Sequence, residues 1–464
     1  MNFPTNVTRH VGGPRCLRLI HRKGNITMRR LIILYVFILI LQTSLAQAAE
    51  RTAMQYRVQV RAEKEDAIYR TNEKILFNVR VLQNGKPLET APLKYHVVGD
   101  GGDKKEGALE IGSGQAQIEC SLPHPGLILC TVSFQDSEGK TIVGYGGAAV
   151  APQEIRDSRP EPPDFDEFWK RKKEELERLP MNPKLVPIDV EKYEKEGVNV
   201  FDLTVDCIGG KPLRAYLIKP VGAKKGGHPI FINYHGAGTT TGSYVSVALD
   251  AAKRGAIALD VNAHGIENGQ PPEHYKGLFD NELKGYSRQN PTDREKYYFL
   301  GMYLRVFRSL AYMKSLPEWD GKTMAVRGNS QGGGQALVAA GSDPQVTVCR
   351  ATVPALCYPL GYLDGNFGGW PNELRGKTAE TADPAIVQTL PYFDAALFAK
   401  RIKGASCFVS TGFIDRTCSP TSVYVAYNNI PTKKAVFPTP TTDHSVPRAT
   451  TDAIEKLFWE TVFP

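Results

Sequence analysis

The segment Gly328–Gly332 reads Gly-Asn-Ser-Gln-Gly and offers the chain's candidate nucleophile, Ser330. The run Met324–Arg327 before it predicts a strand, and the small residues Gly334–Ala340 after it predict a helix. A tight turn between strand and helix strains the serine backbone, and its neighbours must lack bulk. The helix N-terminus also favours negative charge beside the hydroxyl. The pattern therefore predicts a nucleophilic serine, with a Gly-rich loop needed only for packing as the alternative.

A serine hydroxyl is a poor nucleophile near neutral pH, so it needs a base and an acid that orients the base. In a strand-turn-helix setting of this kind, the chain order is serine, acid, histidine. His444 is the only histidine after Ser330, and it follows Lys434–Pro438, which reads as the last strand. His444 is therefore the predicted base.

The acid has several candidates among the carboxylates after the serine. Asp415 directly follows the strand predicted at Ser406–Thr411, where the penultimate strand should present an acid. It is the favoured partner of the base, and Asp364 and Asp443 stay open as alternatives.

A tetrahedral intermediate carries an oxyanion, which two backbone N–H groups should meet. The residue after the nucleophile, Gln331, offers one donor, and the loop His235–Gly238 after the strand Pro229–Tyr234 offers the other at Ala237. His235 is expected to fix this loop by hydrogen bonds. The predicted chemistry uses neither cofactor nor metal, and the chain has no C-x-x-C pair that would suggest zinc.

Two kinds of element must position these residues. From about residue 200 onward, short apolar strands alternate with helical stretches such as Tyr297–Leu316, which predicts a mostly parallel sheet covered on both faces. Residues 55–150 instead hold short alternating strands separated by turn residues, which predict an immunoglobulin-like sandwich. The charged segment Gly99–Gly107 is expected to be a loop. A Pro-rich join, Arg159–Pro163, leads into an amphipathic helix that Asp164 should cap.

The N-terminal residues have the pattern of a secretory signal peptide. Arg29 and Arg30 precede the short apolar run Leu31–Leu41, and Ala46–Ala48 follows with small residues, so we expect a signal at 28–48 with cleavage after Ala48 and a secreted or periplasmic protein. Translation could start at Met1 or at Met28. The predicted domains are an extension and signal at 1–48, a sandwich at 49–155 and a catalytic domain at 156–464.

The charge of the chain limits the classes of macromolecule that it could bind. Residues 1–48 hold seven Lys and Arg and no acid, so the remainder has 50 basic and 49 acidic residues and gives no electrostatic reason to expect nucleic acid. No stable membrane span is expected after signal cleavage.

Cys120 and Cys130 lie on two predicted strands and could form a disulfide in an oxidising compartment or remain buried thiols.

Four segments resemble the acetyl xylan esterase and cephalosporin C deacetylase family, carbohydrate esterase family 7 of the α/β-hydrolase superfamily. They are Pro163–Trp169, His235-Gly236, Gly328–Gly333 in its Ser-Gln-Gly-Gly form, and Asp415–Pro420 in its Asp-x-x-Cys-x-Pro form. The resemblance covers roughly residues 160–464. It implies an α/β-hydrolase fold, the triad Ser330, Asp415 and His444, an oxyanion hole of the Gln331 and Ala237 amides, and no metal.

The chain departs from the family pattern in three places. His444-Ser445 stands where the family usually has His-Glu, and Asn262–Gly265 stands where it usually has Arg-Gly-Gln-Gly, both near the expected mouth of the site. Family members are also expected to lack the N-terminal sandwich. Their ring-like hexamers therefore do not carry over, and a homo-oligomer stays an open expectation.

The sequence thus predicts a secreted serine esterase that removes acetyl groups from acetylated xylan, xylo-oligosaccharides or related small acetyl esters. One alternative is a prolyl-oligopeptidase-like serine peptidase, although the roughly 95 residues before the join are too few for the β-propeller of such enzymes. A further alternative is an inactive hydrolase-fold protein that binds carbohydrate.

Overall fold

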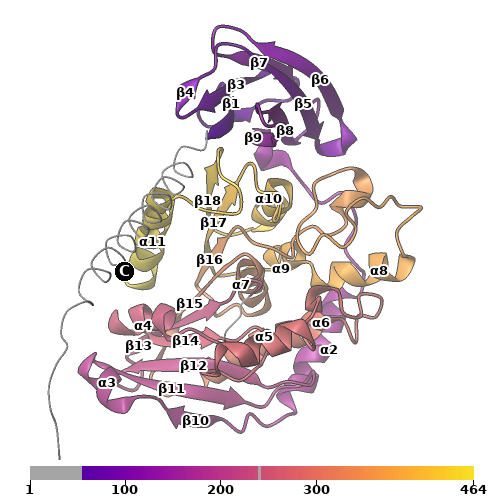
Figure 1. The fold of residues 1–464 in the computed structure, drawn as a ribbon. Coiled ribbons are helices and arrows are strands. Elements are labelled where there is room, and N and C mark those ends of the chain that lie inside the picture. Colours follow the sequence, from indigo (N-terminus) through magenta and orange to yellow (C-terminus); the bar gives the residue numbers. More distant parts are fainter. Residues whose placement is uncertain (1–54, 239–241) are drawn as a thin grey trace, which may run out of the picture. The chain divides into compact units, whose positions relative to one another are not determined.

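The computed structural model describes residues 55–238 and 242–464, and Tyr56–Pro464 form one compact unit (Figure 1). The expected signal peptide at 28–48 and its cleavage site lie outside the described residues. Among the described residues, no helix has the length and apolar character that crossing a membrane requires.

A nine-stranded sheet forms the centre of the larger part, with the strand order β10-β11-β12-β14-β13-β15-β16-β17-β18. The strands from β14 to β18 in this order run parallel, and β10, β11 and β12 pair antiparallel at one edge. Gly209 and Gly210 lie in the connection between the paired strands β11 and β12. The strand bounds are β10 Lys184–Pro187, β11 Val198–Val205, β12 Leu213–Pro220, β13 His228–Tyr234, β14 Ile257–Val261, β15 Trp319–Asn329, β16 Val348–Thr352, β17 Ser406–Gly412 and β18 Lys434–Thr439.

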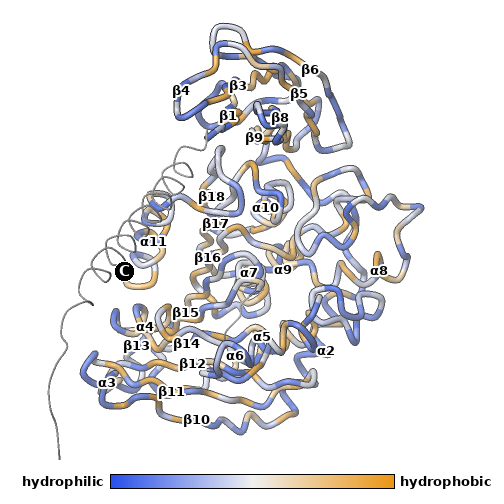
Figure 2. Tube along the Cα trace, viewed as in Figure 1, coloured by the Kyte–Doolittle hydropathy of each residue, from blue (hydrophilic) through white to orange (hydrophobic). Residues whose placement is uncertain are grey.

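Helices cover both faces of this sheet, because successive strand residues point to opposite sides and both sides are apolar. Ile230 and Ile232 of β13 pack into one core with α2, α6, α7, α9 and α10, whereas Phe231 between them packs with α3, α4 and α11 on the other face. Hydrophobic segments recur along the central strands in the hydropathy drawing (Figure 2). The helices are α2 Phe165–Glu177, α3 Val190–Lys195, α4 Val245–Lys253, α5 Pro272–Asp280, α6 Tyr298–Lys314, α7 Gln331–Ser342, α8 Pro384–Thr389, α9 Ala395–Ala399, α10 Pro420–Asn429 and α11 Arg448–Val462, and the 3-10 turns in this part are η3 Tyr286–Arg288, η4 Gly361–Asp364 and η5 Leu390–Phe393.

The N-terminal strands form two sheets that share one buried apolar core. One sheet joins β1, β3, β4 and β7, and the other has the order β2-β9-β8-β5-β6. The bounds are β1 Tyr56–Ala62, β2 Ile68–Tyr69, β3 Ile75–Gln83, β4 Lys86–Pro87, β5 Ala91–Gly99, β6 Lys104–Ile111, β7 Ala116–Cys120, β8 Gly126–Gln135 and β9 Thr141–Val150, with 3-10 turns η1 Asp100–Gly102 and η2 Pro152–Glu154. We refer to these two sheets as the sandwich; its immunoglobulin-like character and the domain limits at 48 and 155 stay predictions.

Two expectations for the sandwich are decided by the structure. The segment Gly99–Gly107 is not a loop throughout, since β6 begins at Lys104 and pairs with β5. Cys120 and Cys130 lie on strands of different sheets and are both free thiols. Burial raises the pKa of these thiols to about 11 and about 12.

A buried carboxylate connects the sandwich to the larger part. Asp100 accepts hydrogen bonds from the Phe367 N–H at 2.7 Å, the Leu127 N–H at 2.8 Å and the Thr421 hydroxyl at 2.7 Å. Phe367 and Thr421 belong to the larger part, on the loop after η4 and on α10. The side chains Ala67, Leu127 and Ala149 of the sandwich also belong to the main apolar core.

Candidate active site

Ser330 lies between β15 and α7 with strained backbone angles, φ 57° and ψ −120°. Its N–H donates to the Thr352 carbonyl at 2.9 Å, and its own carbonyl accepts from the Ala355 N–H at 2.9 Å. A side chain at Gly328 would place Cβ 2.1 Å from the Gly332 carbonyl oxygen, so this turn can form only without a side chain there. The strain of the predicted turn is therefore present, and hydrogen bonds from the next strand and the loop after it hold it.

A continuous hydrogen-bond chain leads from the serine to a buried carboxylate. His444 Nε2 lies 2.9 Å from Ser330 Oγ, and His444 Nδ1 lies 2.7 Å from Asp415 Oδ2. The other carboxylate oxygen, Asp415 Oδ1, accepts the Thr417 N–H at 2.8 Å and the Cys418 N–H at 2.9 Å. The Asp415 side chain is fully buried, whereas 29% of the His444 side chain is exposed. The arrangement holds the ring between the two oxygens, and the imidazole remains partly exposed.

The two alternative acids have other partners. Asp364 accepts two hydrogen bonds from the Arg159 guanidinium, at 2.9 and 2.6 Å. Asp443 accepts the Ser445 hydroxyl at 2.9 Å. The structure thus brings Asp415, and neither Asp364 nor Asp443, to the imidazole.

The loop after β13 approaches the serine from the other side. A Cβ placed on Gly236 would lie 3.8 Å from Ser330 Cβ, so the loop that contains Ala237 runs beside the nucleophile. His235 is buried and forms a short hydrogen bond to Asp260, the next-to-last residue of β14. Asp260 also accepts the Asn233 amide at 2.9 Å and the Tyr244 N–H at 2.7 Å. These bonds fix the loop, as expected of His235.

Gln331 begins α7, so its backbone N–H is one of the four that an α-helix leaves without an internal partner. Its side chain is fully buried, and Gln331 Oε1 accepts the Tyr286 hydroxyl at 2.6 Å. Burial raises the pKa of the same hydroxyl, and the nearby Gly238 N–H acts in the opposite direction. Tyr286 therefore connects the two segments that carry the predicted oxyanion donors. Nothing in the sequence around Tyr286 signals this position.

His264 lies in the segment Asn262–Gly265, which the sequence places near the mouth of the site. This expectation was wrong, because Asn262 and His264 are 2% and 1% exposed. His264 Nδ1 lies 2.7 Å from the Tyr298 hydroxyl, and its ring lies edge-on to Tyr286 at 4.7 Å. Burial lowers the pKa of His264 to about 3, with the nearby Arg305 charge adding to the effect. The segment supports the Tyr286 side chain from behind and does not line the opening.

No cluster of three or more His, Cys, Asp or Glu side chains suited to a metal ion occurs in the described residues. The chemistry available at the site is that of a hydroxyl, an imidazole, a carboxylate and a helix N-terminus. These groups suit acyl transfer through a covalent serine intermediate.

The family model for acetyl xylan esterase (AXE1) matches residues 152–460. This chain belongs to the acetyl xylan esterase family. The acetyl esterase Axe7A of Xylanibacter ruminicola is 31% identical over 428 residues, which cover 91% of this chain and 94% of that protein. As a member of the family, the chain is a carboxylic ester hydrolase.

Two solved structures share the fold. Acetyl xylan esterase 1 from Thermoanaerobacterium sp. JW/SL YS485 matches with a TM-score of 0.56 and 26% identity, over 67% of this chain and 97% of that chain. The acetyl xylan esterase from Paenibacillus sp. R4 matches with a TM-score of 0.55 and 24% identity, over 67% of this chain and 98% of that chain. The predicted α/β-hydrolase fold is confirmed.

The comparisons correct one expectation about the sandwich. Only four residues of this esterase follow the family match at 152–460, yet the similarity to Axe7A extends over 428 residues. The alignment with Axe7A must therefore reach far into the residues before 152. The expectation that all family members lack this N-terminal region was wrong.

Proposed function

We propose that this esterase removes acetyl groups from acetylated xylan and xylo-oligosaccharides, with Ser330 as nucleophile, His444 as base and Asp415 as orienting acid. The observation that carries the proposal is the hydrogen-bond chain from Ser330 Oγ through the imidazole to the buried Asp415 carboxylate, at 2.9 and 2.7 Å. The substrate class follows from the similarity to proteins described as acetyl xylan esterases and an acetyl esterase.

The reaction has two halves. His444 Nε2 takes the proton of Ser330 Oγ as the oxygen attacks the acetyl carbonyl carbon, and the carbonyl oxygen becomes an oxyanion. The imidazolium then gives that proton to the sugar oxygen, the C–O bond breaks and acetyl-serine remains. Water, deprotonated by His444, attacks the acetyl-serine; the imidazolium then returns the proton to Ser330 Oγ as the ester bond breaks and acetate leaves.

The surrounding groups lower the barrier by fixed electrostatics. Asp415 accepts the Nδ1–H and stabilises the positive charge on the ring, while the Thr417 and Cys418 amides occupy its other oxygen. The Gln331 and Ala237 N–H groups are the proposed oxyanion donors. Removing one such donor costs about 10²–10³ in kcat in a serine hydrolase.

The test is acetate release by purified protein from acetylated xylan, acetylated glucomannan, cephalosporin C and longer acyl esters, with 4-nitrophenyl acetate as a general substrate. We expect acetyl esters to be hydrolysed and Ser330→Ala to abolish turnover at unchanged folding. An alanine variant with full turnover would refute the nucleophile. Release of acetate from glucomannan alone would refute the xylan preference.

The export of the protein and its domain limits are part of the proposal. Residues 28–48 would be a signal peptide cleaved after Ala48, and the mature chain would divide into domains at 49–155 and 156–464. The intact mass of the exported protein distinguishes a mature chain that begins at Ala49 from one that retains residues 28–48. A mass that begins at Ala49 supports the proposal, and a mass that includes residues 28–48 contradicts it.

A further inference from the structure

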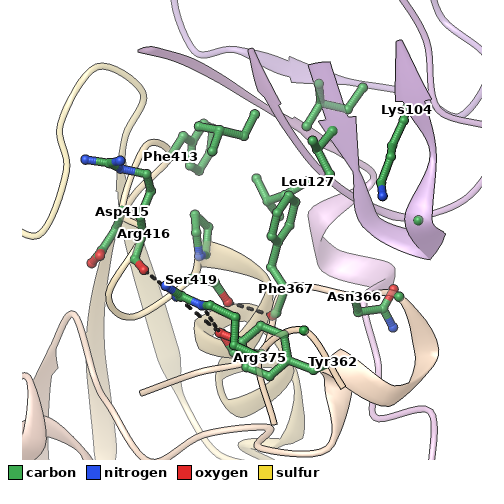
Figure 3. A pocket seen from close by; sticks show the side chains of 18 residues that line it. Lys104, Leu127, Tyr362, Asn366, Phe367, Arg375, Phe413, Asp415, Arg416 and Ser419 are labelled. Atoms are coloured by element: carbon green, nitrogen blue, oxygen red, sulfur yellow. Dashed lines mark hydrogen bonds between the residues drawn. The ribbon is translucent and has the colours of Figure 1, made fainter. Parts of the chain in front are cut away.

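A cavity of about 530 Å³ lies where the sandwich meets the catalytic part (Figure 3). The sandwich contributes Val98, Lys104 and the β8 residues 127–129, and the catalytic part contributes segments within 362–376 and 413–420. Ligand sites are typically concave, mostly apolar, about 300–1,000 Å³ in volume and common at domain interfaces. The volume and position of this cavity fit that description.

The lining offers aromatic surface mainly at two half-buried rings, Phe367 and Tyr362 (Figure 3). Leu127 and Phe413 also line the cavity, but each is only 2% exposed. Aromatic faces suit the apolar C–H face of a pyranose ring, while polar groups at the edge can meet its hydroxyls. A sugar unit is therefore a ligand that the walls can accept.

Three exposed cations surround these rings: Lys104 from the sandwich, and Arg375 and Arg416 from the catalytic part. None of them forms an ion pair within residues 55–238 and 242–464, and the Lys104 ammonium has no hydrogen bond there either. Arg416 donates to the Tyr145 hydroxyl at 2.9 Å, and Arg375 donates to the Arg416 carbonyl at 2.8 Å, so both guanidinium groups are held in place without being neutralised.

Asp415 is the acid among the lining residues, and it does not offset these charges. Its carboxylate is buried and bonded to His444 and to two backbone amides. The cavity thus combines apolar rings with an excess of positive charge at its rim. Such a surface attracts an anion, and a carboxylate suits the guanidinium and ammonium donors.

We propose that this cavity binds a carboxylate-bearing sugar unit, such as a uronic acid branch, of the polysaccharide whose acetyl esters the enzyme cleaves. The inference rests on the proposed function. The segment 413–420 lines the cavity and also holds Asp415 against His444, so one loop belongs to both the cavity and the proposed triad. The sandwich would select acidic regions of the substrate.

The test compares acetylated xylo-oligosaccharides of equal length with and without one glucuronic acid branch. We expect KM to be about twofold to fivefold lower for the branched substrate at low salt, which is the range for solvent-exposed charge pairs. The preference should vanish at about 1 M salt, where the Debye length falls to about 3 Å. Lys104→Gln should bring the ratio of the two KM values toward one.

Lys94→Gln is the matched control, because Lys94 is an exposed lysine of the same sandwich and does not line the cavity. It should leave the KM ratio as in the wild type. A second measurement uses calorimetry with Ser330→Ala protein and a deacetylated branched oligosaccharide, for which we expect binding that salt weakens.

Several outcomes would overturn the inference: equal KM values for both substrates, a ratio that Lys104→Gln does not change, or equal binding of a neutral oligosaccharide at all salt concentrations. Binding of free glucuronic acid as tight as that of the branched chain would show a site for small acids in place of a polysaccharide subsite. A wild-type protein without activity on any acetyl ester would refute the proposed function, which the binding measurement does not depend on.

Discussion

The Tyr286 hydroxyl connects the two segments that carry the proposed oxyanion donors, so its removal should slow acyl transfer. It donates to Gln331 Oε1 at 2.6 Å, and the Gly238 N–H lies near it. Tyr286→Phe removes only the oxygen and keeps the ring, which packs against His264 at 4.7 Å and Tyr298 at 4.9 Å. The change therefore tests a positioning role of one hydroxyl.

The magnitude follows from the groups left behind. The Gln331 amide oxygen loses a buried partner, and an unsatisfied buried group costs about 1–3 kcal/mol of stability. Complete loss of an oxyanion donor would cost about 10²–10³ in kcat. Because both donors remain and only their support is lost, we expect a decrease of about tenfold in kcat with KM little changed.

The assay is steady-state hydrolysis of 4-nitrophenyl acetate, together with urea unfolding of the same preparations. Tyr303→Phe is the matched control, since the buried Tyr303 hydroxyl donates to the Phe393 carbonyl at 2.8 Å, away from the hydrogen bonds that hold Ser330 and Gln331. It should lose similar stability and keep kcat. If both variants lost stability equally and both kept kcat, the positioning role of Tyr286 would be refuted.

Buried groups carry three further predictions. Gly332→Ala should prevent correct folding, because its Cβ would lie 2.1 Å from the Tyr234 carbonyl oxygen. Gly277→Ala is the control and should be tolerated, because open space surrounds Gly277 in α5. Soluble yield and circular dichroism compare the two variants, and a folded, active Gly332→Ala protein would contradict the turn geometry. The folded pKa of His264 is lowered to about 3 from 6.5, so the folded protein binds fewer protons and its free energy of unfolding falls by about 1.4 kcal/mol per unit as pH drops below 6.5. The wild type should therefore lose about 2 kcal/mol relative to His264→Gln between pH 6.5 and about pH 5, and parallel unfolding curves would count against a buried neutral imidazole. The comparison with the variant is needed because Asp100 changes the stability of the protein in the opposite direction over the same pH range. Burial raises the pKa of Asp100 to about 6, so its protonation favours the folded state as pH falls from about 6 toward the ordinary pKa of 3.8. Asp100→Ala leaves the Phe367 and Leu127 amides and the Thr421 hydroxyl without their acceptor. We therefore expect the free energy of unfolding, measured in urea near neutral pH, to fall by about 3 kcal/mol. A loss below about 1 kcal/mol would show that these groups find other partners.

The sequence predicted the parts of the fold that have strong local patterns. The central strands were recognised because both faces are buried and their residues form continuous apolar runs. The strand β6 was missed because seven of the eight residues of Lys104–Ile111 are not buried, so no alternation marks it. Its pairing with β5 depends on a partner strand that local reasoning does not supply.

The candidate site was predictable where chain order limits the choices. A single histidine follows Ser330, and Asp415 stands directly beyond a strand end, so elimination and fold logic were enough to select the residues that the structure brings together. Tyr286 could not be selected in this way. It lies 45 residues before Gln331, on a 3-10 turn, and its ring packs against His264 and Tyr298, whose contacts local sequence does not predict.

The segment 413–420 links the sandwich to the catalytic residues. The Asp415 carboxylate of this segment bonds to the His444 imidazole, and the Arg416 guanidinium donates to the Tyr145 hydroxyl of β9. The hydroxyl of Thr421, just after the segment, donates to the Asp100 carboxylate of η1. A Cβ on Gly147 of β9 would also lie 2.2 Å from the Phe413 carbonyl oxygen, so the two backbones meet without an intervening side chain. One short loop thus fixes the proposed acid and forms the contact with the sandwich. Because packed interiors transmit small displacements, changes at this contact should reach the acid before they reach Ser330, which the Thr352 carbonyl and the Ala355 amide hold independently.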